Sequence, residues 1–321
     1  MRVFLTTPWI PAEWIRAHQL DPCALWCAET FPCHPTPLGA GVCLFAEWVV
    51  RFAEAQPDAA VIFASACDQL RRGFDTATLH GRHRAFLFNL PATQTPAAKQ
   101  IYRSELERLG RCLCELGGRA PTPESLRCEM LKAAKARRRL LDAAPSSPAR
   151  AYAGALAQFH RDGVFSAPPA AAPGNQVPLA IVGGPFCAPH WPLLDVIESA
   201  GGRVVLNATE TGERSLSSAN EPDAAGGDPF DALADASFNG IADAFQRPNT
   251  PLYSWLKPRL LARNVRGLVL WHFTGCDLWR AEAPTLRELT GLPVLLLEAG
   301  EGPGVSQRQV NRVEAFLETL K

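Results

Sequence analysis

Residues 59–68 read Ala-Ala-Val-Ile-Phe-Ala-Ser-Ala-Cys-Asp, and residues 267–277 read Gly-Leu-Val-Leu-Trp-His-Phe-Thr-Gly-Cys-Asp. Each stretch is a near-continuous apolar run of strand length that ends in a Cys-Asp pair. Such a run is typical of a strand covered on both faces, as in a parallel sheet with helices on either side. The carboxyl ends of such strands form the ligand crevice of a doubly wound sheet. We therefore expect Cys67 and Cys276 at a crevice, each near the start of a helix, whose dipole lowers a thiol pKa.

The same alternation of apolar runs and helical patterns extends along the whole chain. Further strands are expected at Val3–Thr6, Ala85–Leu90, Leu179–Gly183, Arg203–Asn207 and Pro293–Leu297. Helical patterns lie between them, at Cys43–Ala55, Ala98–Leu116, His190–Ser199 and Gln307–Leu320. Alternating strands and helices indicate parallel sheets with helices on both sides. The sequence therefore predicts an α/β protein with two flavodoxin-like (Rossmann-like) parallel-sheet domains.

A helical segment separates the two sets of strands. From Ala97 to about Asp162 the pattern is helical and no strand is expected. Residues 166–175, Ser-Ala-Pro-Pro-Ala-Ala-Ala-Pro-Gly-Asn, then form a Pro/Ala-rich connector. We place an N-terminal α/β domain with a helical layer at residues 1–165 and a C-terminal α/β domain at residues 176–321.

Composition excludes several classes of partner. The 321 residues carry 32 Lys and Arg against 32 Asp and Glu, so the formal net charge is zero and gives no electrostatic case for nucleic acid. No apolar run of about 18 residues appears, which argues against a membrane span, and the first residues lack a signal-peptide pattern. We expect a cytoplasmic protein, in which the ten cysteines serve as thiols, metal ligands or redox centres.

The spacing of most cysteines matches no common metal motif. Cys23, Cys27 and Cys33 lie at intervals of four and six, unlike the runs of ferredoxins. The paired Cys-x-x-Cys knuckles of a zinc ribbon and the glycine-rich nucleotide signatures are also absent. The two Cys-Asp turns lie 209 residues apart (276 − 67 = 209) and suggest cysteines that converge across an interdomain cleft. The alternative is a coincidence of two core cysteines.

Several short motifs follow one another in a characteristic order. Residues 8–18 read Pro-Trp-Ile-Pro-Ala-Glu-Trp-Ile-Arg-Ala-His and are similar to the motif Pro-x-Glu-Leu-Ile-x-Ala-Ala-Gly. Residues 65–72 read Ser-Ala-Cys-Asp-Gln-Leu-Arg-Arg and are similar to a second motif, Ser-Cys-Asp-x-x-Arg-Arg. Residues 273–277, 293–298 and 312–318 complete the series. In order and spacing the chain resembles the subunits of 2-hydroxyacyl-CoA dehydratases and class I benzoyl-CoA reductases, and in particular a 2-hydroxyglutaryl-CoA dehydratase D-component. The resemblance covers nearly the whole chain.

This resemblance implies a [4Fe–4S] cluster held by three cysteines, with one iron left for a non-protein ligand. Cys67 and Cys276 correspond to the two Cys-Asp turns of the family. Cys43 is our first choice for the remaining ligand because it opens an apolar-periodic helix, whose positive end favours a thiolate. Cys33 is the alternative first ligand, since its interval of 34 residues (67 − 33 = 34) is nearer the family's usual one.

The resemblance also implies a function and partners. The expected protein is the iron–sulfur subunit of a heteromeric CoA-thioester dehydratase (lyase) or reductase (oxidoreductase) that works by low-potential, single-electron radical chemistry. Its expected partners are a homologous second subunit, an ATP-dependent electron-donating activator protein and an acyl-CoA substrate. A non-catalytic cluster-bearing or scaffold subunit is one alternative. A double-cubane small-molecule reductase is another, with Cys23, Cys27 or Cys33 as ligands of a second cluster.

Catalytic side chains are less clear from the sequence. His190 begins a helix at the mouth of the expected crevice and titrates in the range needed for proton transfer, although a helix-start histidine is more often structural. Glu13 and His18 lie near the first crevice edge by resemblance and are similarly weak candidates. The basic helix of residues 130–139 is either a solvated face or a functional surface. As a functional surface, it would bind the phosphates of coenzyme A or dock an electron-donating partner protein.

Overall fold

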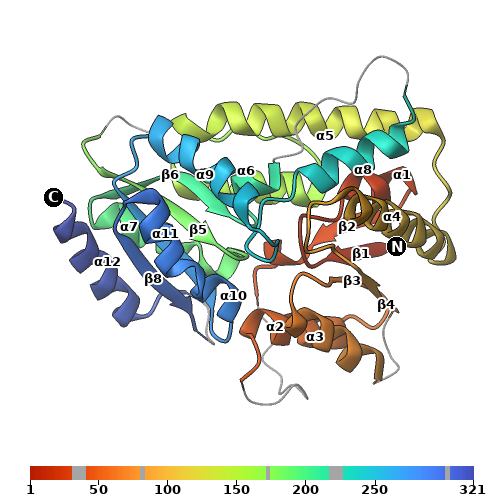
Figure 1. The fold of residues 1–321 in the computed structure, drawn as a ribbon, viewed down its shortest axis with the longest axis horizontal. Coiled ribbons are helices and arrows are strands. Elements are labelled where there is room, and N and C mark those ends of the chain that lie inside the picture. The colour runs from red at the N-terminus through yellow and green to blue at the C-terminus, as the bar shows by residue number, and fades with distance from the viewer. Residues whose placement is uncertain (31–40, 80–83, 171–173, 217–226, 301–303) are drawn as a thin grey trace.

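The computed structural model describes residues 1–30, 41–79, 84–170, 174–216, 227–300 and 304–321. Within these residues, eight strands form two four-stranded sheets with every neighbouring pair parallel (Figure 1). The first sheet has the order β2-β1-β3-β4 and the second the equivalent order β6-β5-β7-β8. Both match the first four strands of the flavodoxin-like order. The predicted arrangement of two parallel-sheet α/β halves is therefore confirmed.

The seven predicted strands are all present. The strands of the described chain are β1 (Arg2–Leu5), β2 (Asp21–Ala24), β3 (Ala60–Ala64), β4 (Arg84–Phe88), β5 (Val177–Gly183), β6 (Gly202–Thr209), β7 (Gly267–Phe273) and β8 (Val294–Ala299). Sequence reasoning missed β2, an edge strand that pairs only with β1. Its four residues, Asp-Pro-Cys-Ala, include a proline, which is tolerated at a sheet edge but argues against a strand when read from sequence.

Helices fill the connections between strands. In the first half they are α1 (Ala12–Ala17), α2 (Leu44–Ala55), α3 (Asp68–Leu79), α4 (Pro96–Glu115), α5 (Pro123–Ala143) and α6 (Ala149–Asp162). In the second half they are α7 (Pro192–Ser199), α8 (Pro229–Asn239), α9 (Thr250–Ala262), α10 (Asp277–Arg280), α11 (Glu282–Thr290) and α12 (Gln307–Thr319). Short 3₁₀ turns are η1 (Leu25–Cys27), η2 (Ala144–Ser146), η3 (Ala188–His190) and η4 (Glu213–Leu216).

Central strands are enclosed on both faces. All five residues of β3 and all seven of β7 are buried, whereas the edge strand β4 alternates between buried and partly exposed residues. This is the burial expected when helices cover both sides of a parallel sheet. The two Cys-Asp turns therefore leave the most deeply buried strand of each sheet.

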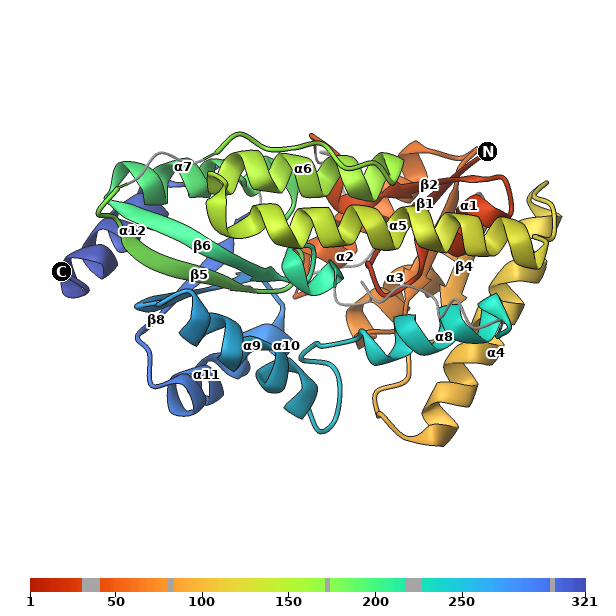
Figure 2. The ribbon, with the colours of Figure 1, turned by 90° about the horizontal axis from the view of Figure 1, so that it is seen from above.

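The helical segment joins the two halves. Figure 2 shows α5 and α6 side by side along the length of the molecule. Helix α6 contacts β2 of the first sheet and β6 of the second, and α8 packs on α4 and α5 although it follows β6 in the chain. One hydrophobic cluster accordingly contains buried residues of both sheets. The division into domains at residues 165 and 176 stays a prediction.

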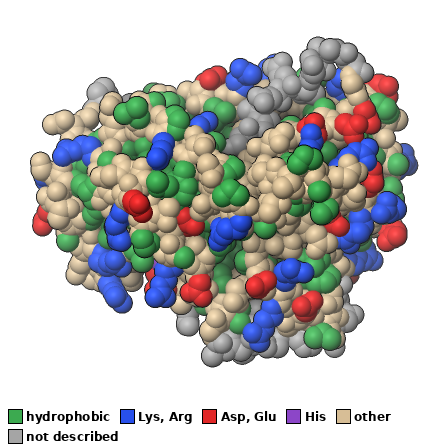
Figure 3. Space-filling view, viewed as in Figure 1, with side chains coloured by type: hydrophobic (Ala, Val, Ile, Leu, Met, Phe, Trp, Pro, Cys, Tyr) green, Lys and Arg blue, Asp and Glu red, His purple; other side chains and the backbone are tan. Residues whose placement is uncertain are grey.

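Surface features agree with the balanced composition. On the face seen in Figure 3, basic and acidic side chains are interspersed. Among the described helices, none has both the length and the apolar character needed to cross a bilayer.

His190 lies in the aromatic core of the second half. Its side chain is 2% exposed, and its ring packs on Trp271 and Phe273 with centroid distances of 5.0 and 5.4 Å. Burial lowers the pKa of His190 to about 4. Because the folded pKa lies below the unfolded value of about 6.5, the neutral ring stabilises the fold above pH 6.5, and this contribution is lost as pH falls toward 4.

We predict that His190→Phe flattens the acid limb of the stability curve. Between about pH 7.5 and pH 5, the wild-type protein should lose about 2 kcal/mol more unfolding free energy than the variant, which keeps an aromatic ring but has no proton to bind. Urea unfolding of both proteins across this range measures the difference. An identical pH dependence in the two proteins would contradict the assignment.

Candidate functional site

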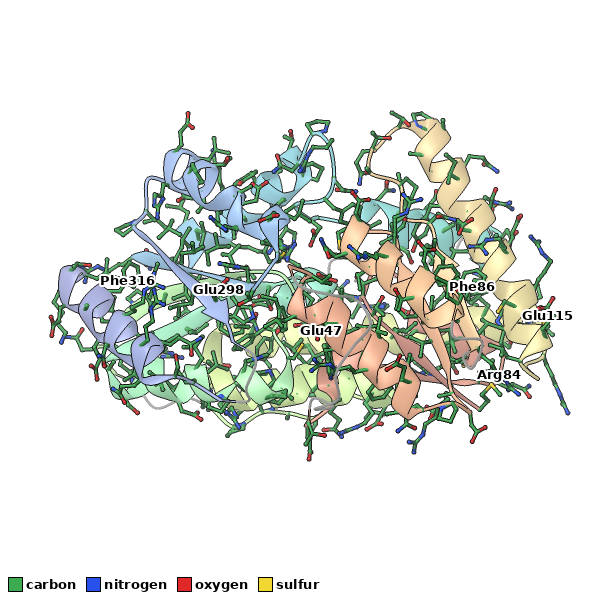
Figure 4. The ribbon with its side chains drawn as sticks, turned by 90° about the horizontal axis from the view of Figure 1, so that it is seen from below. Glu47, Arg84, Phe86, Glu115, Glu298 and Phe316 are labelled. Carbon is green, nitrogen blue, oxygen red and sulfur yellow. The ribbon has the colours of Figure 1, made fainter. Side chains whose placement is uncertain are left out.

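Three cysteines occupy equivalent positions at the starts of helices. Cys67 lies between β3 and α3, Cys276 is the N-cap residue of α10 after β7, and Cys43 is the N-cap residue of α2. Figure 4 labels Glu47 on α2, in the central region of the molecule between the two sheets. Strand, turn and helix thus place Cys67 and Cys276 at the carboxyl edges of their sheets, as the sequence predicts. Cys43 opens a helix without a preceding strand.

Backbone contacts bring these three segments together. The Leu44 N–H donates to the Thr274 carbonyl at 3.0 Å, and the Cys43 N–H donates to the Gln69 side chain at 3.4 Å. Gly275 has a φ of +78°, and a Cβ there would lie 2.8 Å from the Val42 carbonyl oxygen. A glycine is therefore required at this turn by both its conformation and its contact. The turn before Cys276 rests directly on the chain that leads into α2.

The sulfur atoms interact as a group. The Cys276 thiol donates a hydrogen bond to the Cys43 sulfur, which lowers the pKa of Cys43 and raises that of Cys276. Cys67 interacts electrostatically with both. Burial raises the pKa of Cys67 to about 11 and contributes to the rise at Cys276. A lowered pKa is therefore found at Cys43 alone, where the hydrogen bond from Cys276 is the main cause and the backbone N–H groups of the helix start add to it. At Cys67 and Cys276, desolvation and neighbouring sulfurs raise the pKa against the effect of the helix start.

Each sulfur also faces backbone N–H groups of the helix that follows it. Donors come from Phe45 and Ala46 toward Cys43, from Gln69 and Leu70 toward Cys67, and from Trp279 toward Cys276. Cys43 is 7% exposed, and the other two cysteines are partly exposed. These thiols lie at a protected edge with preformed hydrogen-bond donors for negative sulfur.

Two of the other predicted ligands, Cys23 and Cys27, have partners elsewhere. Cys33 lies outside the described residues, so its position relative to Cys43 is not tested. The Cys23 thiol bonds to the Asp21 carbonyl, and the Cys27 thiol bonds to the Ala157 carbonyl at 3.7 Å. Across the described ranges, no set of three or more His, Cys, Asp or Glu side chains is gathered closely enough to hold a single metal ion.

Glu210 is a further candidate residue of this site that sequence reasoning missed. It directly follows β6, and its carboxylate accepts a hydrogen bond of 2.7 Å from the Thr7 hydroxyl, which follows β1. Burial and the nearby charge of Asp243 raise the pKa of Glu210 to about 8, against the opposing effects of Thr7 and Arg214. Cys276 also acts electrostatically on it. The signal was available, since Glu210 satisfies the same strand-end criterion as the two Cys-Asp turns.

A buried arginine fixes the carboxyl edge of the second sheet. Arg214 is fully buried, pairs with Asp243 at 2.8 Å and donates to the Ala208 and Ala242 carbonyls at 2.8 and 2.7 Å. Its guanidinium also lies over the Trp279 ring, 4.6 Å from the centroid. These contacts tie the end of β6 to the start of α10, and so to Cys276.

The weak catalytic candidates have structural environments. Glu13 is buried and forms an ion pair with Arg137; burial alone would raise the pKa of Glu13, but the charge and hydrogen bond of Arg137 hold it below its ordinary value. Arg137 belongs to the basic helix, and this pairing makes it unsuited to bind phosphate. His190 is enclosed by aromatic rings, and His18 is buried between α1 and α4 next to Gly110.

We predict that Gly275→Ala destabilises the protein more than Gly291→Ala does. Both glycines have a φ near +70°, but a Cβ at Gly275 would meet the backbone of residues 42–43, whereas one at Gly291 would have no neighbour within 4 Å. The shared conformational cost cancels, which leaves about 1–3 kcal/mol for the clash. Chemical unfolding of the two variants measures the difference. Equal stabilities would mean that the two segments do not touch as described.

Comparison with known proteins complements this geometry. No protein with a curated description matches the chain significantly. A solved structure of the SBP FpvC from Pseudomonas aeruginosa in complex with Mn²⁺ aligns over 100% of this chain and 98% of its own, with 14% identity and a TM-score of 0.24, too low to carry an argument. The sequence profile described as 2-hydroxyglutaryl-CoA dehydratase, D-component, matches residues 9–320. The chain belongs to this family and is thus a subunit of a 2-hydroxyacyl-CoA dehydratase-type enzyme.

Proposed function

We propose that this chain is the iron–sulfur subunit of the dehydratase, with Cys43, Cys67 and Cys276 holding a [4Fe–4S] cluster. The observation that carries the proposal is the meeting of three cysteines from separate segments, each at the start of a helix, at the carboxyl edges of two sheets. Family membership over nearly the whole chain supports it.

The donor set fits such a cluster. In a cubane cluster each cysteine binds its own iron, so its ligands need not surround one point as the ligands of a single ion do. Three cysteines leave one iron open for a non-protein ligand. The backbone N–H groups directed at each sulfur would stabilise the negative charge of bound thiolates and tune the cluster potential.

A bound cluster would supply one low-potential electron to the substrate. The residues of this chain would bind the cluster, limit the access of water to it and transfer protons to the substrate. We assign proton transfer to Glu210, because loss of a hydroxyl group as water requires a proton at the leaving oxygen. With a pKa of about 8, this carboxyl carries its proton near neutral pH, and Thr7 fixes its orientation.

The partners belong to the same proposal. A dehydratase component acts with a homologous second subunit, and its electron would come from an ATP-dependent activator protein, while the substrate is an acyl-CoA. A scaffold subunit that holds the cluster without catalysis is the second candidate, favoured by the buried, structural environments of Glu13, His18 and His190. Turnover assays of the chain alone and with its partner subunit separate the two.

The cluster proposal predicts that Cys67→Ser loses most of its iron and acid-labile sulfide with little loss of fold. Cys67 is partly exposed at a strand end, so its sulfur contributes more to ligation than to packing. Cys128→Ser is the matched control, since Cys128 is exposed on α5. Anaerobic purification, iron and sulfide analysis, and electron paramagnetic resonance of the reduced proteins provide the measurement. Wild-type iron content in Cys67→Ser would refute this ligand assignment.

Glu210→Gln should keep the cluster but lower turnover by about 10²–10⁴-fold, the usual contribution of a proton-transfer group. Wild-type activity should fall as pH rises through about 8, where Glu210 loses its proton, and the variant should lack this limb. Thr7→Val, which removes only the orienting hydroxyl, should have a smaller effect. An unchanged pH profile in Glu210→Gln would exclude the role.

A further inference from the structure

A cavity of about 590 Å³ opens among α1, α4, α5 and α8. Its volume is within the range of small-molecule sites in proteins, roughly 300–1,000 Å³. No residue that lines it belongs to α2, α3 or α10, whose starts carry the three cysteines. Figures 1 and 2 show α4, α8 and the beginning of α5 together at the end of the molecule opposite α12. This cavity is therefore separate from the candidate cluster site.

Aromatic and other apolar side chains form much of its wall. Trp14 and Phe230 lie with ring centroids 4.9 Å apart, and Leu126, Pro121 and Pro229 add further apolar surface. The Trp14 ring nitrogen already donates to the Leu106 carbonyl at 2.9 Å. Trp14 therefore contributes an apolar surface without an unsatisfied polar group, which suits a ligand with an apolar body.

The polar groups of the wall are mainly acceptors. The His18 ring is 2% exposed, and its Nδ1 bonds to the Trp14 carbonyl at 2.7 Å, so Nδ1 carries the proton and Nε2 is an acceptor. No hydrogen bond from the described residues reaches this Nε2. Gly110, within α4, lines the same wall; a Cβ there would lie 3.3 Å from Nε2 and 3.0 Å from Trp14. The glycine leaves the acceptor and the indole uncovered by a side chain.

Carboxylates are more numerous than guanidinium groups in the cavity lining, although the starts of α5 and α8 also face it. The lining includes the carboxylates of Glu107, Glu115 and Asp228 against the single guanidinium of Arg111. Arg103, outside the lining, pairs with Glu107 and lies 5.0 Å from the Phe230 ring centroid, so this wall already accommodates one cation beside an aromatic ring.

We propose that this cavity is a second small-molecule site, which binds an apolar organic cation: a molecule with an aromatic or aliphatic body and an ammonium group. The body would pack on Trp14 and Phe230, and the ammonium group would donate to His18 Nε2 and the carboxylates. This site is independent of the proposed cluster function.

The test uses the full-length protein and two probes with the same ring and opposite charge, naphthylethylammonium and naphthylacetate. Cys114 lines the cavity and is exposed, while Cys128 is exposed on α5 outside the lining, so the chain contains its own control. At ten times its Kd, the cation should slow iodoacetamide alkylation of Cys114 about tenfold and leave Cys128 unchanged. Peptide mass spectrometry measures both rates.

Variants then assign the bound probe to this cavity. Calorimetry should show no cation binding to Cys114→Trp, where the indole fills the space, and normal binding to Cys128→Trp. Glu115→Gln should weaken the cation about two- to fivefold, and Glu298→Gln should not; Figure 4 labels these two glutamates toward opposite ends of the molecule. Absence of cation binding, tighter binding of naphthylacetate, or full binding to Cys114→Trp would each overturn the proposal.

Discussion

The approach of the Gly275 turn to residues 42–43 is the contact on which the site depends. It is a backbone contact between two distant parts of the chain. The absence of a side chain at Gly275 allows the close approach, and the hydrogen bond from the Leu44 N–H to the Thr274 carbonyl connects the two segments. Cys43 and Cys276 follow these backbones directly, so their sulfurs meet because the main chains meet. Cys67 joins them through Gln69, whose side chain accepts the Cys43 N–H.

Two further devices hold that contact in place. Arg214 forms an ion pair with Asp243, donates hydrogen bonds to backbone carbonyls and packs on the Trp279 ring. These contacts connect the end of β6 to α10. Helix α6 touches a strand of each sheet, so the sheets cannot separate without exposing apolar surface. Arg214 thus holds the carboxyl edge of the second sheet, and α6 links the two sheets.

Much of this could be predicted from the sequence, for identifiable reasons. Strands β3 and β7 are uninterrupted apolar runs because both of their faces are covered, and a Cys-Asp pair after each run locates the carboxyl edge. Strand β2 was missed because an edge strand needs no such run and tolerates its proline. Glu210 also directly follows a strand, but a single glutamate there lacks the repeated Cys-Asp pattern that marks the two cysteine turns. The pKa of Cys67 was expected in the wrong direction, since a sequence shows a helix start but not the burial that opposes its dipole. The cavity beside Trp14 arises from helices brought together by tertiary packing alone, which no local pattern encodes.

The three cysteines are widely separated in the order of synthesis. A ribosome that adds about 5–20 residues per second completes the 209 residues between Cys67 and Cys276 (276 − 67 = 209) in roughly 10–40 seconds. During that interval the emerging chain contains Cys43 and Cys67 but neither Cys276 nor the turn at Gly275 that contacts residues 42–43. Insertion of the proposed cluster would therefore wait until Cys276, in the last quarter of the chain, has been made and folded, and until then Cys43 and Cys67 are thiols of an unfinished protein.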